Sequence, residues 1–301
     1  MTTSLPLIWN GRVITETGWS GRLRGAFLAP RSGRVTHLLV QMGLFQRAYA
    51  VPLTAGRIGA SDALVIPSSV VQMAPGRGSV RLTDKIQVNL AGEAASLRGL
   101  IIDQKDGIPL WLLVRYQQET IAVENLAAHN LVSGSLSLRL TQQEKDNLPV
   151  YRADGEALRN VLVALEAVDL AGGSTFGDVR VDVQGGVARL SGTVWLVQQR
   201  EEAERAAISS QGVLAIQNDI ITDWDLRIGI ATALAKANLS QTGLIVVRSK
   251  RGKISLKGHL PSRWLLEEAV RVASETIGVR SVESDVVIVQ ELATSAGSTI
   301  E

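Results

Sequence analysis

An internal repeat with a spacing of 66 residues occupies most of the C-terminal half of the chain. Its clearest parts are GGVARLSGTV, from Gly185 to Val194, and RGKISLKGHL, from Arg251 to Leu260. Between Val181 and Asp219, twelve residues are identical to their counterparts in Val247 to Asp285. Chance would give roughly two or three identities in a window of ordinary composition. A repeat of this length indicates one small domain per copy.

The hydrophobic pattern predicts the same five elements in each copy. Helical spacing gives way to strict alternation, a glycine-containing tight turn, a second alternating strand, a second helix and a last strand. The expected helices are 155–168 and 197–210 in the first copy, and 223–237 and 262–277 in the second, with Asp223 or Asp225 as N-cap. The prediction is an α+β domain with the order αββαβ, present twice.

These motifs resemble the BON domain, the bacterial osmotic-stress and nodulation module. The matching residues read GGVARLSG…GVLAIQND and RGKISLKG…GVRSVESD. The resemblance assigns one domain to residues 153–222 and a second to 223–290, followed by a tail, 291–301. Six glycines carry the motif: Gly186, Gly192, Gly212, Gly252, Gly258 and Gly278. We expect Gly192 and Gly258 to face inward, where the absence of Cβ would let a helix approach.

The N-terminal half contains a fainter repeat with a spacing of 74 residues. LRGAFLAPRSGRVTHLLV, from Leu23 to Val40, aligns with LRGLIIDQKDGIPLWLLV, from Leu97 to Val114. Seven positions are identical, among them the pairs Gly25/Gly99 and Gly33/Gly107. Short strands separated by turns at close intervals predict an all-β barrel or sandwich in this half.

The motif APRSGRVTHLLV with the later AVPL resembles the PRC barrel, the small barrel of the photosynthetic reaction-centre H subunit and of a ribosome maturation factor. The first unit is assigned to residues 1–75 and the second to 76–141, where Glu124-Asn125 replaces the Pro-Leu of the first. Residues 142–152 are predicted to be a linker. The whole chain is therefore expected to be multidomain, with two PRC-barrel-like units followed by two BON-like domains.

The sequence contains no pattern that indicates an enzyme. It has no cysteine, which excludes thiolate catalysis, disulfides and cysteine-based zinc sites. His37, His129 and His259 lie in different units without ligands at metal-binding spacing, so we interpret them as structural. Nucleophile-elbow, zinc-protease and phosphate-loop motifs are absent. We predict no catalytic residues, no metal and no cofactor.

The distribution of charge indicates an anionic partner. Residues 226–266 contain no Asp or Glu but eight Lys and Arg, and residues 17–61 contain six Arg and no acid. An ordinary solvated face is the alternative interpretation. The candidate contact residues surround the second hairpin: Arg248, Lys250, Arg251, Lys253, Lys257, Arg263 and Trp264. Trp195 and Trp264 follow the two hairpins; they could anchor at a membrane interface, although we favour burial beneath the helix.

The BON resemblance implies a phospholipid surface as partner, and the PRC resemblance implies protein docking. The leading hypothesis is a non-enzymatic scaffold in the cytoplasm, peripheral to the inner membrane, since the N-terminus MTTSLPLIWNGRV lacks the features of a signal peptide. The alternatives are an RNA-binding adaptor and a homo-oligomeric structural assembly. Against RNA, no KH-type GxxG loop or stacking series of aromatic residues is present.

Overall fold

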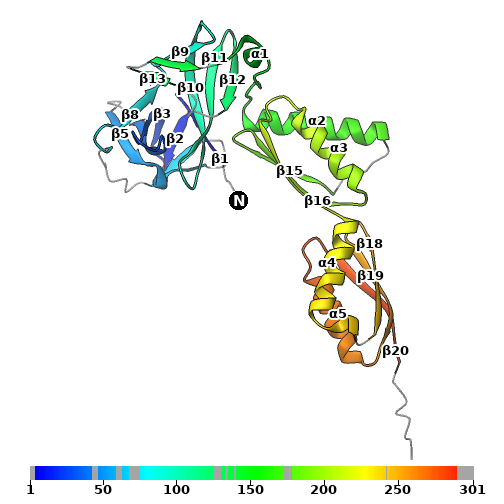
Figure 1. Cartoon of the computed structure of the whole chain (residues 1–301). Helices are drawn as coiled ribbons and strands as arrows, with labels where there is room; N and C mark the ends of the chain where they lie inside the picture. The colour runs from blue at the N-terminus through cyan, green and yellow to red at the C-terminus, as the bar shows by residue number, and fades with distance from the viewer. Residues whose placement is uncertain are drawn as a thin grey trace, which may run out of the picture. The chain divides into compact units, whose positions relative to one another are not determined.

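A computed structural model describes residues 4–42, 47–58, 63–67, 75–124, 130–132, 135–138, 140–172, 176, 178–241 and 243–289. Figure 1 shows the chain with its helices and strands labelled. Within these ranges, no helix has both the length and the hydropathy needed to cross a bilayer.

The N-terminal half is β-rich, as predicted, and the faint sequence repeat folds as two sheets with the same strand order. The first runs β5-β4-β3-β2-β7-β6 and the second β12-β11-β10-β9-β14-β13. The first comprises β2 (Arg12–Thr15), β3 (Ser20–Leu28), β4 (Val35–Met42), β5 (Arg47–Pro52), the 3-10 helix η1 (Leu53–Ala55), β6 (Arg57–Ile58) and β7 (Leu64–Ile66). The second comprises β9 (Gln87–Leu90), β10 (Glu93–Asp103), β11 (Pro109–Tyr116), β12 (Glu119–Glu124), β13 (Asn130–Val132) and β14 (Ser135–Leu138).

Each sheet also takes one strand from the other half of the sequence. The first strand of the chain, β1 (Ser4–Ile8), pairs antiparallel with β10 of the second sheet. Its counterpart β8 (Val80–Thr83) pairs antiparallel with β3 of the first sheet. The expected boundary at residues 75/76 therefore does not separate two structural units. The two units exchange strands and form one domain, called the β domain below.

Gly25 and Gly99, identical in the sequence repeat, lie where the exchanged strands pass. Thr83 is in register with Gly25, and Ile8 is in register with Gly99. A Cβ atom on Gly25 would lie 2.1 Å from the carbonyl oxygen of Leu82, and one on Gly99 would lie 2.3 Å from that of Leu7. Both positions require glycine because a backbone atom occupies the space of a side chain.

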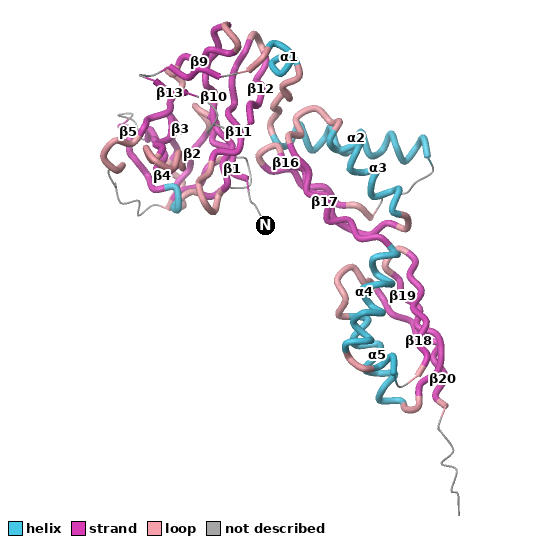
Figure 2. The backbone as a smooth tube through the Cα atoms, viewed as in Figure 1, coloured by secondary structure: helices cyan, strands magenta, loops and turns pink. Residues whose placement is uncertain are grey.

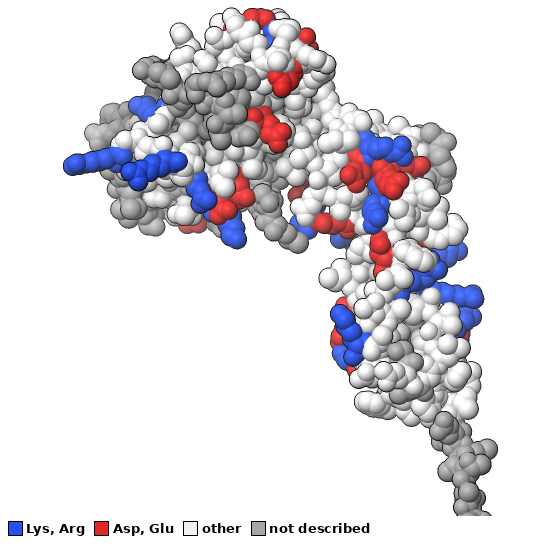
Figure 3. Space-filling view, in the orientation of Figure 1, with Lys and Arg blue, Asp and Glu red and all other residues white. Residues whose placement is uncertain are grey.

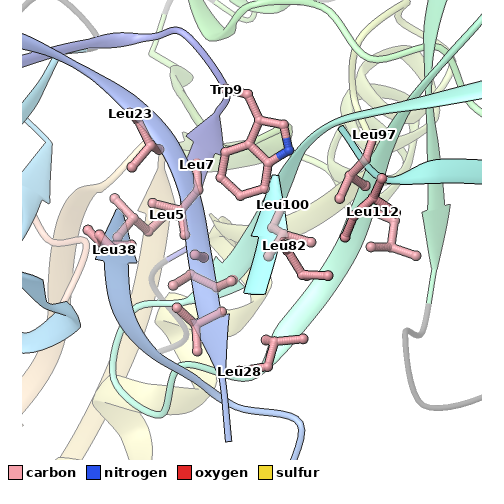
Figure 4. Close-up of a cluster of buried hydrophobic side chains, with 14 of the residues drawn as sticks. Leu5, Leu7, Trp9, Leu23, Leu28, Leu38, Leu82, Leu97, Leu100 and Leu112 are labelled. Atoms are coloured by element: carbon pink, nitrogen blue, oxygen red, sulfur yellow. The ribbon is translucent and has the colours of Figure 1, made fainter. Parts of the chain in front are cut away.

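One hydrophobic core joins the two halves of the β domain. The exchanged strand β1 contributes Leu5 and Leu7, both fully buried, and Trp9 follows it. Figure 4 shows these side chains among leucines of both sheets, including Leu38 and Leu100. Since apolar burial is the main favourable contribution to folding, the exchange ties the stability of each half to the other.

Residues 141–152, most of which had been predicted as a linker, form an ordered part of the β domain. They contain helix α1 (Gln142–Asp146), which starts with a capping box between Thr141 and Glu144. Lys145 is buried, forms an ion pair with Glu93 and lies over the ring of Tyr116. The segment resembles a linker in sequence because it is polar and contains Pro149, but here tertiary contacts order the backbone.

Replacing Glu93 with Gln is expected to lower the urea midpoint of the β domain near neutral pH, because the buried Lys145 loses its carboxylate. The hydrogen bonds from Lys145 and Tyr116 hold the pKa of Glu93 below its ordinary value of 4.5. A depressed carboxyl pKa stabilises the fold above the unfolded-state pKa, and this contribution is lost as pH falls through the folded-state pKa. The difference between wild type and Glu93→Gln should therefore persist at neutral pH and disappear in acid. Glu124→Gln, at an exposed strand position, serves as control; an equal effect there would contradict the prediction.

The C-terminal half contains two αββαβ domains, as predicted. The first comprises α2 (Asp154–Gly172), β15 (Arg180–Gln184), β16 (Val187–Val194), α3 (Val197–Ile208) and β17 (Ala215–Thr222), with sheet order β15-β16-β17. The second comprises α4 (Asp223–Lys236), the 3-10 helix η3 (Leu239–Gln241), β18 (Leu244–Lys250), β19 (Lys253–Leu260), α5 (Arg263–Ser274) and β20 (Ser281–Ile288), with sheet order β18-β19-β20. In the second domain both helices cover the same face of the sheet (Figure 2).

The hairpin tip of the first αββαβ domain packs on the outer face of the second sheet of the β domain. Ser4 Oγ donates a 2.5 Å hydrogen bond to the carbonyl oxygen of Gln184. Leu214 joins a buried apolar cluster with Ile101, Leu113 and Ala122. The tip residues Asp182–Ala188 accordingly belong to the same compact unit as the β domain.

Candidate functional site

The candidate site is the end of the hairpin between β18 and β19 in the second αββαβ domain. Lys250 and Lys253 face each other as the last pair before the turn, and Arg248 is in register with Ser255. The turn residues Arg251 and Gly252 have φ angles of 52° and 77°. Two-residue turns of the type that fits the twist of antiparallel strands require positive φ at both positions. Arg251 adopts this conformation at a cost of about 1 kcal/mol.

A buried carboxylate holds the turn. Asp223, the first residue of α4 and only 3% exposed, accepts hydrogen bonds from the backbone N–H of Arg251 (2.7 Å) and Gly252 (3.1 Å). It also accepts one from Ser249 Oγ (2.5 Å). The first domain repeats the arrangement: Asp154 accepts from the N–H groups of Gly185 and Gly186. The negative charge is thus buried, while the cations at the turn remain outside.

The N-cap of α4 is Thr222, not Asp223 or Asp225 as predicted. Thr222 and Asp225 form a capping box. Burial would raise the pKa of Asp225, but the N–H and hydroxyl of Thr222, together with Arg200, hold it below its ordinary value. The two aspartates therefore have different roles: Asp225 completes the cap of the helix, and Asp223 accepts the hydrogen bonds that hold the hairpin turn.

Strand alternation places the cations on the sheet face that the helices leave open. Arg248, Lys250 and Lys253 are all exposed. Figure 3 shows Lys and Arg side chains gathered over this part of β18 and β19. Like charges directly opposite each other in a sheet are destabilising. The Lys250–Lys253 pair therefore carries a local cost that a bound anion would relieve.

The structure does not bring all of the predicted contact residues together. Lys257 forms an ion pair with Asp285 at 3.1 Å, and Arg263 pairs with Glu267 at 3.3 Å. Arg263 and Trp264 begin α5, just beyond the end of β19 that is opposite the turn. From Lys253 to His259 the strand spans roughly 20 Å, at about 3.3 Å per residue. The site therefore reduces to Arg248, Lys250, Arg251 and Lys253.

The tryptophans after the hairpins are exposed, so the favoured expectation of burial was wrong. Trp264 is 68% exposed and Trp195 is 55% exposed. Both lie at the start of a helix or just before it, where the chain turns away from the sheet. Neither lies at the cationic turn.

Sequence reasoning missed two residues near the cationic turn. Trp224, next to Asp223, is 55% exposed, and Arg227 lies 4.8 Å above its ring. The role of Asp223 itself was also missed. The recurrence of Asp154 and Asp223 at the start of the first helix of each repeat could have revealed it.

All six motif glycines have positive φ. At Gly192 and Gly258 the reason differs from the expected approach of a helix. A Cβ atom on Gly258 would lie 1.9 Å from the carbonyl oxygen of Leu244, and one on Gly192 would lie 2.1 Å from that of Asp178. The close neighbour is the chain at the start of the adjacent strand, so these glycines permit strand pairing at that point.

The histidines do not form a ligand set in the described part of the chain. His37 lies in β4 with Nδ1 at 3.1 Å from Thr36 Oγ1, and His259 is exposed in β19. His129 lies outside the described residues. Among the residues that are described, no three His, Asp or Glu side chains are grouped as metal ligands.

Comparison with known proteins gives matches to solved structures but none to a curated protein. One similar structure is CdsD, a structural protein of the type III secretion system of Chlamydia trachomatis, with 14% identity and a TM-score of 0.37 over 44% of this chain and 63% of that one. Another is the C-terminal domain of CdsD, with 17% identity and a TM-score of 0.33 over 41% and 64%. The chain thus spans less than two thirds of the length of these two structures.

The family comparison concerns the C-terminal half. The BON domain family matches twice, over residues 163–223 and 222–290, close to the predicted domains 153–222 and 223–290. The PRC-barrel resemblance of the N-terminal half remains a prediction. The two αββαβ folds and the two family matches agree, and residues 163–290 therefore contain two BON domains.

Proposed function

We propose that the protein is a non-enzymatic scaffold that attaches peripherally to anionic phospholipid surfaces through its second BON domain and docks protein partners on its β domain. The observation that carries the lipid part is the exposed cationic hairpin end formed by Arg248, Lys250, Arg251 and Lys253. In the first BON domain the turn residues are Gly185 and Gly186, and the tip packs on the β domain. Of the two BON hairpins as far as the structure describes them, the second therefore combines an exposed face with cations at its tip.

The expected attachment is weak and salt-sensitive. Each basic residue near an anionic leaflet contributes about 1 kcal/mol, so four give roughly 4 kcal/mol. Salt reduces this attraction, because the screening length falls from about 10 Å at 0.1 M to about 3 Å at 1 M. Such attachment suits a protein that is held at the cytoplasmic face of the inner membrane and released again.

The protein-docking part is supported by the outer face of the β domain. One such face already holds two elements of the first BON domain, the hairpin tip and Leu214. This use agrees with the PRC-barrel resemblance, which implies docking platforms. The exchange of strands and the common core provide the rigidity that a platform requires.

Co-sedimentation with phosphatidylcholine vesicles, with and without phosphatidylglycerol, tests the lipid proposal. We expect binding only to the anionic vesicles, falling as salt increases. Lys250→Glu/Lys253→Glu should weaken it by roughly 100-fold or more, since two attractions become repulsions. The control Lys236→Glu/Arg263→Glu changes the net charge equally, from +2 to −2, at positions away from the turn.

Two outcomes would contradict the proposal. One is equal binding to neutral and anionic vesicles, and the other is an equal loss in the control variant. Single-stranded RNA is included as a competitor, because RNA binding through the same cations would favour the adaptor alternative.

A further inference from the structure

The internal repeat gives the β domain two equivalent outer faces. Strand registers define the equivalence: Leu113 pairs with Ala122 in the second half as Leu39 pairs with Ala50 in the first. Likewise, Ile8 of the exchanged strand is in register with Gly99, as Thr83 is with Gly25. Each face is thus formed by three central strands and one exchanged strand.

The face of the second half is covered by elements of the first BON domain. Ile101, Leu113 and Ala122 are fully buried there in one cluster with Leu214 of the first BON domain, against which Trp111 and Tyr151 also pack. Leu214 lies between α3 and β17, and the separate turn between β15 and β16 is also close: a Cβ atom on Gly185 would lie 3.2 Å from Ile101 Cγ2 and 2.9 Å from Ser4 Oγ. This kind of face therefore accepts a tight β-turn together with an apolar side chain beside it.

The equivalent face of the first half forms an open groove of about 600 Å³. Its lining includes Leu39 and Thr83, the counterparts of Leu113 and Ile8, and the exposed Ala48. In the first half the exchanged strand brings Arg81 to the position of Pro6, which makes this face cationic.

Three cations line the groove: Arg24, Arg81 and Lys85, with Asp84 as the single acid. Arg24 is held in place by the side-chain oxygens of Gln41 and Asn10, both neutral. Arg81 and Lys85 are exposed. Within the described residues, none of the three cations forms an ion pair.

We propose that this groove binds an acidic β-turn of a partner protein, with an apolar side chain over Leu39 and carboxylates against Arg81 and Lys85. The proposal deepens the docking role of the β domain given above and depends on it. Charge complementarity selects the partner: the second-half face accepts a neutral glycine turn, whereas the first-half face has a cationic rim.

Nucleic acid is a poorer fit to the groove. Proteins that bind single strands combine a cationic path with aromatic side chains on which bases stack. The residues that line the groove include no aromatic side chain. Its apolar residue Leu39 is instead the counterpart of Leu113, one of the residues on which Leu214 packs in the second half.

The test uses a fluorescein-labelled cyclic hairpin peptide with the tip Glu-Leu-Asn-Gly-Glu and a copy with both Glu replaced by Gln. Binding to the full chain is measured by anisotropy at low salt, and amide shifts of Gln41, Ala48 and Thr83 locate it. We expect saturable binding of the acidic peptide and roughly tenfold weaker binding of the neutral copy, as for the loss of two exposed ion pairs.

Variants place the binding in the groove. Arg81→Glu/Lys85→Glu should abolish it, and Ala48→Trp should block it by filling the groove without a change of charge. Arg31→Glu/Arg34→Glu, exposed cations of the same half outside the lining, should leave it unchanged. Equal binding of both peptides, an equal loss in the control, or tighter groove-dependent binding of oligouridylate would overturn the proposal. Vesicle binding of the groove variants is measured in parallel. Because the proposed lipid contact lies at Lys250 and Lys253, a loss of vesicle binding is distinguishable from a loss of peptide binding at the groove.

Discussion

Alanine at Gly25 or Gly99 is expected to destabilise the β domain by about 3 kcal/mol, the upper range for overpacking a core. The added Cβ would lie 2.1 or 2.3 Å from a backbone carbonyl oxygen of the exchanged strand. A backbone atom within a paired strand cannot rotate away as the end of a side chain can. The strand must therefore move, and its pairing and buried leucines move with it.

Hydrogen–deuterium exchange of the full chain would show which strand is released. Gly99→Ala should accelerate exchange first in β1 (Ser4–Ile8), and Gly25→Ala should do so first in β8 (Val80–Thr83), because these are the paired partners. Gly155→Ala is the matched control, since a Cβ there has no atom within 4 Å and lies in a helix. Unchanged exchange in the exchanged strands would mean that the two halves do not depend on the crossing.

Replacing Asp223 with Ala is expected to destabilise the second BON domain by roughly 3 kcal/mol. The substitution removes the acceptor of two backbone N–H groups and of one hydroxyl, and the N–H of Gly252 is buried away from water. The turn at Arg251 and Gly252 would then lose the contact that fixes its strained conformation. Thermal unfolding, with exchange rates of β18 and β19 as a local readout, measures the effect.

The same variant separates turn geometry from charge in membrane binding. Asp223→Ala makes the chain more positive, yet it should weaken binding to phosphatidylglycerol vesicles because the cations lose their fixed arrangement. Asp285→Ala makes the same change of charge at a 67% exposed side chain that pairs with Lys257. Its effect on stability should stay within about 0.5 kcal/mol. Equal vesicle binding by Asp223→Ala and Asp285→Ala, above that of the wild type, would show that net charge alone governs attachment and would contradict the prediction.

Much of the C-terminal half could be predicted because its signals are local. Alternation along Val179, Val181 and Val183 identifies a half-buried strand, and the Gly185-Gly186 pair identifies the turn that follows. The repeat at 66 residues then provides an independent second copy of the same pattern. These local signals were enough to predict the secondary structure, the αββαβ order of the elements and the resemblance to the BON domain.

The cationic site could be predicted only in part because it depends on which end of a strand a residue occupies. Arg263 and Trp264 follow the hairpin closely in sequence, but β19 carries the chain roughly 20 Å from the turn before they are reached. Lys257 carries a charge in the sequence, and the parallel pairing of β19 with β20 places Asp285 beside it. Neither relation has a local sequence signal.

The sequence by itself determined the duplications, the αββαβ order, the β-rich N-terminal half and the glycines on which the turns depend, since each follows from local periodicity and backbone conformation. Only the tertiary structure decided the exchange of β1 and β8, the packing of Lys145 against Glu93, the burial of Asp223 and the exposure of the tryptophans. These features arise from contacts between residues far apart in the chain. Their free energy depends on what surrounds a side chain in space, which the order of residues along the chain does not specify.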